Sequence, residues 1–148
     1  MNSSPVISKP FDDLTKAELY AILALRIQVF CVEQNCPYQD VDDQDQHAQH
    51  VFIKDENSIM AYARILDGKQ DVCHIGRVVV NANYRKRGLA TVIMKACIES
   101  LKNKPGTIEI SAQSYLTDFY KSLGFISTGK FYLEDDIPHE QMTLLTGT

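Results

Sequence analysis

A run of β-branched residues leads into a basic, glycine-containing loop and then an amphipathic helix, and this succession constrains the fold more than any other feature. The run is Val72–Val80, the loop is Arg85–Ala90, and the helix is expected from Leu89 to about Leu101. Apolar residues recur along the helix at helical spacing, so one of its faces packs on a core. The first N–H groups of the helix then converge beside three cations, which predicts a pyrophosphate site.

Small residues in the loop support this interpretation. Gly88 has no Cβ to hold the backbone away from a phosphate, Ala90 lets the helix close on the ligand, and Thr91 adds a hydroxyl. The alternative is a solvated basic loop that caps a core helix. The chain contains neither GxxxxGK(S/T) nor GxGxxG, which excludes the two common nucleotide-binding loops.

The remaining patterns alternate helices with strands. Thr15 to Glu18 has the form of a capping box, so a helix should begin there and run to about Cys31. The order of elements predicts one mixed α/β domain over residues 1–148. We expect a hairpin connection at Asp55–Asn57 and a short helix at Leu116–Leu123. Further strands are expected at Pro5–Ser8, His50–Ile53, Ser58–Leu66, Thr107–Ala112, Phe125–Tyr132 and Gln141–Leu145.

Composition and charge exclude several classes of protein. A net charge of −4 argues against a general nucleic-acid binder, because such proteins carry an excess of Lys and Arg. Neither a secretion signal nor a segment apolar enough to span a membrane is apparent. The spacing of the four cysteines fits neither a CxxC metal site nor a dense disulfide framework, so we expect reduced thiols and a cytoplasmic location.

Two regions resemble the GNAT superfamily of N-acetyltransferases. Arg85, Gly88 and Ala90 occupy the matching positions of its (R/Q)xxGx(G/A) signature, and the preceding strand is similar to the family's fourth strand. Ile108–Ala112 is similar to the fifth strand, and Phe119–Phe125 has the aromatic residue, the Tyr and the closing GF that follow it. Further blocks resemble the ElaA-like subgroup: Leu25–Tyr38, Asp42, Asp45, His50, Ile75–Val78, Ser111–Gln113, Leu133–His139 and Met142.

This resemblance implies a fold and an activity. The fold is a mixed, mostly antiparallel sheet of six to seven strands, flanked by about four helices and splayed between its fourth and fifth strands. The activity is transfer of an acetyl group from acetyl-CoA to a primary amine of a small molecule or peptide, by direct attack in a ternary complex and without a metal. The residues implied in coenzyme binding are Val78, Val79, Val80, Arg85, Lys86, Arg87, Gly88, Leu89, Ala90, Thr91 and Tyr120.

The reaction needs a proton donor for the departing thiolate and an uncharged amine. The resemblance places Tyr120 near the coenzyme sulfur, which makes it the candidate general acid; the alternative is a packing aromatic. The resemblance also implies that a backbone N–H near Val78 holds the oxyanion. The general base stays open, and a dedicated base need not exist. Its candidates are Glu33 after the first helix, His74 and Glu109 on the strands beside the cleft, and His139 near the C-terminus.

Several charged residues allow more than one interpretation. The loop that borders the acceptor site in this fold holds four aspartates, which favours a cationic acceptor, the alternative being a solvated acidic loop. They are Asp40, Asp42, Asp43 and Asp45. His47 and His50 could share a metal, although two histidines without a third ligand give weak support. Arg26 and Arg77 interrupt apolar patterns and are expected to pair with buried carboxylates such as Glu33 or Glu134.

Three hypotheses about the function therefore remain open. The first is the active N-acetyltransferase, the second a coenzyme-binding regulatory module with little or no catalysis, and the third a metal-binding protein built on the two histidines. GNAT proteins often pair through their C-terminal strands or helices, so a homodimer is compatible with each of the three hypotheses. Asp136 stands where the subgroup usually has Gly, and we expect it to accept a positive φ there.

Overall fold

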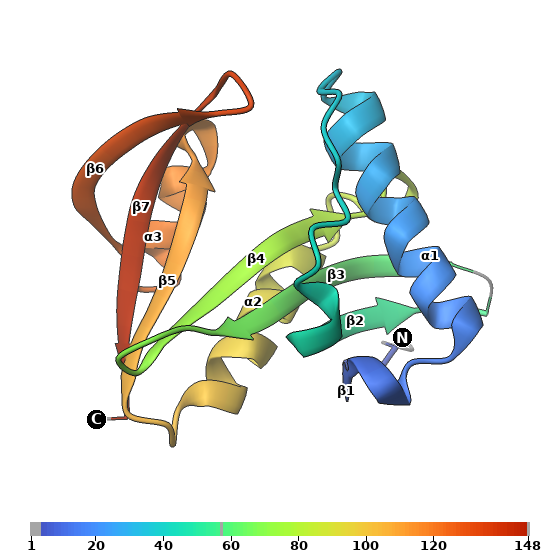
Figure 1. Ribbon diagram of the computed structural model, residues 1–148, viewed down its shortest axis with the longest axis horizontal. Coiled ribbons are helices and arrows are strands. Elements are labelled where there is room, and N and C mark those ends of the chain that lie inside the picture. The colour runs from blue at the N-terminus through green and yellow to red at the C-terminus, as the bar shows by residue number, and fades with distance from the viewer. Residues whose placement is uncertain (1–3, 57, 148) are drawn as a thin grey trace.

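The chain folds around one sheet that opens into a V (Figure 1). The computed structural model describes residues 4–56 and 58–147, so the predicted hairpin residue Asn57 lies outside the described residues. Over these ranges seven strands follow one another in the order β1-β2-β3-β4-β5-β7-β6, and only the β4–β5 pair is parallel. The strands are β1 (Ile7–Pro10), β2 (Gln49–Lys54), β3 (Ile59–Asp67), β4 (Val72–Val80), β5 (Gly106–Gln113), β6 (Ile126–Glu134) and β7 (Ile137–Thr146). The predicted mixed, mostly antiparallel sheet is confirmed.

Three α-helices occur in the described ranges, against the four or so that the resemblance implied. They are α1 (Lys16–Arg26), α2 (Leu89–Leu101) and α3 (Thr117–Ser122). The number is lower because residues 35–48 hold only one turn of 3-10 helix, Asp45–His47. In the described part of the chain, no helix combines the length and the apolar character needed to cross a membrane.

The two long helices cover opposite faces of the sheet. On β2, Val51 and Ile53 belong to the core beneath α2, whereas Phe52 between them packs with α1. This alternation follows from the two-residue period of a strand. Both faces of the central strands are therefore buried, which explains why they read as continuous apolar runs.

The start of α1 is fixed as predicted. The Thr15 hydroxyl accepts a hydrogen bond from the Glu18 N–H at 3.0 Å, and the Glu18 carboxylate accepts one from the Thr15 N–H at 2.9 Å. Glu18 also pairs with Lys9 and Lys54, which ties the helix to β1 and β2. Burial alone would raise the pKa of Glu18, but the hydrogen bonds from Lys54, Thr15 and Lys9 lower it to about 2.

The helix does not end where the sequence suggested. The α-helical geometry stops at Arg26, and a π-helical segment, η2 (Ile27–Glu33), continues past the expected end at Cys31. Bonds that span five residues carry this wider turn, such as the one from the Gln34 N–H to the Val29 carbonyl at 3.1 Å. π-Helical turns are frequently found at functional sites.

Strands β4 and β5 pair only where they begin. Val72–His74 lies in register with Thr107–Glu109, and the strands separate beyond that point, which confirms the predicted splay. A β-bulge lies just past the separation: Tyr62 of β3 faces Val79 and Arg64 faces Gly76, so two residues of β4 oppose one of β3. The bulge residues are Arg77, at φ +53°, and Val78. A bulge leaves its extra residue out of the ladder, so backbone groups beside the opening are released from the sheet.

A two-residue turn joins β6 to β7 and gives a test of backbone strain. Asp135 and Asp136 both have positive φ, +51° and +62°, as a type I′ turn requires, and the expectation for Asp136 is confirmed. Since glycine enters this region without a steric penalty, Asp136→Gly should raise the free energy of unfolding by about 0.5–1 kcal/mol. Asp136→Ala, which keeps a Cβ and loses the local polar group, should lower it. Urea denaturation measures both, and the same sign for the two variants would contradict this account of the turn.

Candidate active site

The opening of the V is a cleft of about 740 Å³. One wall is the free length of β4 together with η2, and the other comprises β5, α3 and the β6–β7 turn, which stand apart at the open end of the molecule in Figure 1. Several residues predicted to bind the coenzyme line it: Val78, Val79, Val80, Arg85, Ala90 and Tyr120. The others, Lys86, Arg87, Gly88, Leu89 and Thr91, belong to the adjoining loop and the first turn of α2.

The N-terminus of α2 opens beside this cleft. Gly88 is its N-cap residue, in the left-handed conformation at φ +74°, and no side chain caps the helix. A Cβ built on Gly88 would meet no atom within 4 Å, so the space beyond it is open. The first N–H groups of a helix without a capping side chain carry partial positive charge and suit an anion. The geometry therefore fits the predicted pyrophosphate site.

A salt bridge spans the mouth of the cleft. Arg85 holds Glu33 by two contacts, Nη1 to Oε2 at 2.9 Å and Nη2 to Oε1 at 3.1 Å, while its Nε donates to the Val80 carbonyl at 3.2 Å. Glu33, at the end of η2, thus lines the cleft but is engaged with Arg85 of the basic loop. A carboxylate so paired would first have to leave the guanidinium before it could take a proton from an amine.

Tyr120 lies where strand β5 and helix α3 border the cleft. Its side chain is 7% exposed and packs edge-on against Phe119 and Phe125. Burial, with a smaller contribution from Tyr115, raises the pKa of Tyr120 to about 12. The phenol therefore keeps its proton at neutral pH, and among the residues that the structure describes none accepts a hydrogen bond from it. Tyr120 therefore has a proton that it could donate to a group bound in the cleft.

The strand residues proposed as bases lie elsewhere. His74 and Glu109 face each other in register, with 3.7 Å between Nδ1 and Oε2, at the last point where β4 and β5 still pair. Because the strands separate only after this pair, neither residue is among those that line the cleft. This corrects the expectation that they point into it. His139 does line the cleft, from the first residues of β7.

Comparison with known proteins assigns the family. The model of the acetyltransferase (GNAT) domain matches residues 13–146, nearly the whole chain. This chain belongs to the GNAT acetyltransferase family. The enzyme class follows from the family, and the GNAT chain is an acyltransferase.

Individual relatives agree with this assignment. The GNAT chain is 38% identical over 148 residues to a UPF0039 protein of Schizosaccharomyces pombe, covering 97% of this chain and 99% of the relative. The crystal structure of Escherichia coli ElaA matches with a TM-score of 0.88 at 36% identity, covering 94% of this chain and 98% of ElaA. An acyl-CoA N-acyltransferase from Pseudomonas aeruginosa matches with a TM-score of 0.87 at 37% identity and the same coverage. The resemblance to the ElaA-like subgroup is thereby confirmed.

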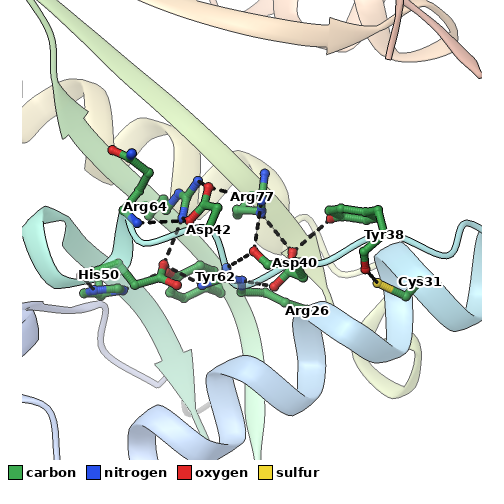
Figure 2. Close-up of polar contacts among 11 residues, drawn as sticks. Arg26, Cys31, Tyr38, Asp40, Asp42, His50, Tyr62, Arg64 and Arg77 are labelled. Carbon is green, nitrogen blue, oxygen red and sulfur yellow. Dashed lines mark hydrogen bonds and ion pairs between the residues drawn. The ribbon is translucent and has the colours of Figure 1, made fainter. Parts of the chain in front are cut away.

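The acidic loop of the GNAT chain is neutralised from within (Figure 2). Three of its four aspartates form ion pairs with arginines of α1, β3 and β4, and only Asp43 is left to the solvent among them. The pairs join Arg26 to Asp40 and Asp45 (both 2.7 Å), Arg64 to Asp42 (2.6 Å) and Asp45 (2.9 Å), and Arg77 to Asp40 (2.9 Å) and Asp42 (3.4 Å). The loop therefore offers little free negative charge to a cationic acceptor and gives that expectation little support, so the charge of the acceptor stays a prediction.

The pairing partners of two arginines were also misassigned. Arg26 and Arg77 do pair with carboxylates, as expected, but the partners come from the acidic loop and not from Glu33 or Glu134. Hydrogen bonds from Arg64, against a smaller effect of burial, lower the pKa of Asp42 to about 2. This network clamps residues 40–45 onto the sheet. Sequence reasoning missed Arg64, although a lone arginine within the apolar run of β3 was a usable signal.

The predicted histidine pair cannot share a metal. Both ring nitrogens of His50 already have partners, the Tyr62 hydroxyl at 2.6 Å from Nδ1 and the Asp45 carbonyl at 2.9 Å from Nε2. His47 instead lines a second cavity, together with residues such as Pro10 and Leu101. Within residues 4–56 and 58–147, no group of three or more His, Cys, Asp or Glu side chains could hold an ion.

Proposed function

We propose that this acyltransferase uses acetyl-CoA and moves its acetyl group to a primary amine of a small molecule or peptide, by direct attack in a ternary complex. The main support for the proposal is that one wall of the cleft is continuous. The free edge of β4, with its bulge at Val78, leads directly to the uncapped N-terminus of α2. An extended pantetheine arm suits a strand edge, and a pyrophosphate suits the helix terminus.

The bulge supplies a further element of the chemistry. Neither Arg77 nor Val78 has a register partner in β3 or β5 within the described ranges. The backbone N–H of Val78 would therefore be available to the thioester carbonyl, whose oxygen becomes an oxyanion when the amine attacks. Tyr120, across the same cleft, would return a proton to the thiolate that leaves.

The experiment is an acceptor screen. Purified protein is mixed with acetyl-CoA and a panel of polyamines, amino sugars and peptides with free amines, and the released CoA thiol is followed. Acceptor-dependent release above the rate of spontaneous hydrolysis is expected with at least one class. The regulatory-module alternative predicts a rise in the melting temperature with acetyl-CoA but no release from any acceptor.

Loss of the Tyr120 hydroxyl should slow catalysis without weakening coenzyme binding. Tyr120→Phe should lower kcat roughly a hundredfold, which is the low end for loss of a general acid, while the Kd for acetyl-CoA changes less than about twofold. The reason is that the phenyl ring keeps the contacts with Phe119 and Phe125 and only the proton donor is lost. Tyr20→Phe, at an exposed tyrosine of α1 that does not line the cleft, is the matched control and should leave kcat unchanged. A weakened Kd with an unchanged kcat would show that Tyr120 is structural.

We also propose a cytoplasmic location for the enzyme. All four cysteines, Cys31, Cys36, Cys73 and Cys97, are free thiols, which supports a reducing compartment such as the cytosol.

The homodimer stays a prediction. The edge strand β6 exposes Ile126, Phe131 and Leu133, so light scattering at several protein concentrations is the appropriate test.

A further inference from the structure

Two hydrogen-bond acceptors face each other in the cleft. His139 Nδ1 lies 2.7 Å from the Ile137 carbonyl, and since a carbonyl can only accept, Nδ1 must carry the hydrogen. In a neutral ring Nε2 then holds the lone pair. Its neighbour, 3.4 Å away, is Oε2 of Glu134, which also accepts when ionised. When the ring is neutral, no hydrogen lies between Nε2 and the carboxylate, so a third group that donates hydrogens to both acceptors would complete the arrangement.

The imidazole is held firmly in this orientation. Tyr132 stacks on it, with ring centroids 6.0 Å apart and an interplanar angle of 15°. The Tyr132 hydroxyl is hydrogen-bonded to Ser111 of β5, so the stacking ring is itself fixed. The His139 residue is 6% exposed, whereas the Glu134 side chain is 54% exposed, and both line the cleft. A fixed, buried base beside an accessible carboxylate is the arrangement expected where an amine enters from solvent.

We propose that the protonated amine of the acceptor binds beside His139 Nε2 and Glu134 Oε2, within hydrogen-bond distance of both, and that His139 is the general base of the transfer. The ligand class is a primary ammonium group, whose N–H bonds can be donated to both acceptors at once. The inference rests on the proposed function, because it assumes that an amine attacks a thioester bound in this cleft. It also revises the site of acceptor recognition from the neutralised aspartate loop to the β6–β7 turn.

Two protons leave the amine nitrogen during the transfer. His139 Nε2 takes one proton from R–NH₃⁺, and the R–NH₂ so formed attacks the carbonyl carbon of acetyl-CoA with its lone pair. The new C–N bond forms as the carbonyl π electrons move to oxygen; they return as the C–S bond breaks and its electron pair leaves with the CoA sulfur. Tyr120 gives its proton to the thiolate, and the Tyr120 phenolate so formed takes up the second proton that nitrogen loses. The products are R–NH–acetyl, CoA–SH and one proton, left on His139 and then released to solvent.

A purely structural pair would look similar but behave differently. If His139 were an imidazolium bound to Glu134, the pair would brace the β6–β7 turn and would not discriminate between acceptors. Other charged or titratable groups nearby are Tyr132 on the ring face, Asp135 and Asp136 in the turn, Glu140 next in the chain, and Cys36, whose Sγ lies 3.7 Å from the Asp135 carbonyl. None of these supplies a cation to hold Glu134 instead.

The test uses a variant that keeps the structural contact. In His139→Asn the side-chain amide nitrogen can replace Nδ1 as donor to the Ile137 carbonyl, while the lone pair of Nε2 is lost. With acetyl-CoA and the best amine of the acceptor screen, kcat should fall about a hundredfold with an unchanged Kd for acetyl-CoA. Glu134→Gln, at an exposed position that tolerates substitution, should raise the KM for the amine about tenfold and change kcat less. Retention of wild-type kcat by His139→Asn, or of wild-type KM by Glu134→Gln, would overturn the proposal.

A second acceptor separates a base from a positioning residue. Hydroxylamine is largely uncharged at pH 7.5, so it needs no deprotonation before it attacks. The loss of kcat in His139→Asn should therefore be clearly smaller with hydroxylamine than with an alkyl amine, whereas a merely structural role predicts equal losses. Should wild-type protein acetylate neither kind of acceptor, the proposed function itself fails. Should wild-type protein be active and the losses be equal, only the role of His139 fails.

Discussion

Gly88→Glu should abolish measurable acetyl-CoA binding while the protein stays folded. Gly88 has φ +74° and caps α2, so any other residue is strained there by roughly 1–3 kcal/mol. The new side chain would also enter the open space where no atom lies within 4 Å, and would bring a negative charge to the place expected for two phosphates. Exclusion and repulsion together should weaken the affinity roughly a thousandfold, or about 4 kcal/mol.

Gly129→Glu is the matched control for this result. Gly129 has φ +83° and also has no atom within 4 Å of a built Cβ, but it lies in β6 and does not line the cleft. The same substitution there imposes similar strain and the same charge without reaching the coenzyme. Calorimetry should find wild-type affinity in Gly129→Glu and none in Gly88→Glu, with similar melting temperatures. Equal affinities in the two variants would remove the helix terminus from the binding site.

Arg26→Met should lower the free energy of unfolding by about 3–5 kcal/mol, the usual cost of breaking a buried ion pair from one side. Arg26 is 0% exposed and contacts Asp40 and Asp45 at 2.7 Å, with its guanidinium 5.8 Å from the centre of the Tyr62 ring. The methionine fills much of the space but leaves buried carboxylate oxygens without their donor. Lys95→Met, on the exposed side of α2, is the control and should change stability by less than about 0.5 kcal/mol.

The cost of Arg26→Met should depend on pH. Burial would raise the pKa of Asp45, but Arg26 and Arg64 lower it overall, so its paired form stabilises the native state above the unfolded pKa and this stability is lost on acidification. In the variant Asp45 loses one of its two arginines, so its native pKa lies higher and less stability is lost. The difference between wild type and variant, from urea denaturation, should therefore shrink between pH 7 and pH 3. A constant difference would mean that packing, and not charge, sets the cost.

Local signals in the sequence were sufficient for most of the fold. The capping box at Thr15, the strand Val72–Val80 and the helix after Gly88 were each found because neighbours in the chain determine them. The end of α1 was misjudged because the π-helical turn keeps the apolar residues of Ile27–Glu33 on a pattern that also fits an α-helix. Hydrophobic periodicity does not distinguish the two geometries over a single turn.

The candidate site was harder to predict from the sequence, because its side chains come together only through tertiary contacts. The aspartates of the loop are neutralised by arginines 14 to 37 positions away, and no local pattern reports that pairing. His74 seemed suitable because it lies on the fourth strand, but only the register with Glu109 reveals that the cleft begins beyond it. His139 and Glu134 are close in the sequence, yet the orientation of the imidazole depends on a backbone carbonyl.

The most direct measurement is a titration of ¹⁵N-labelled protein with acetyl-CoA, followed by the chemical shifts of the backbone amides. Binding between β4 and the start of α2 predicts the largest changes at residues 86–91 and 78–80, saturating at one coenzyme per chain. Amides around the second cavity, lined by residues such as Pro10, His47 and Leu101, should not move. No change at 86–91, or changes gathered at the second cavity, would contradict coenzyme binding in the cleft and the acetyl transfer that depends on it.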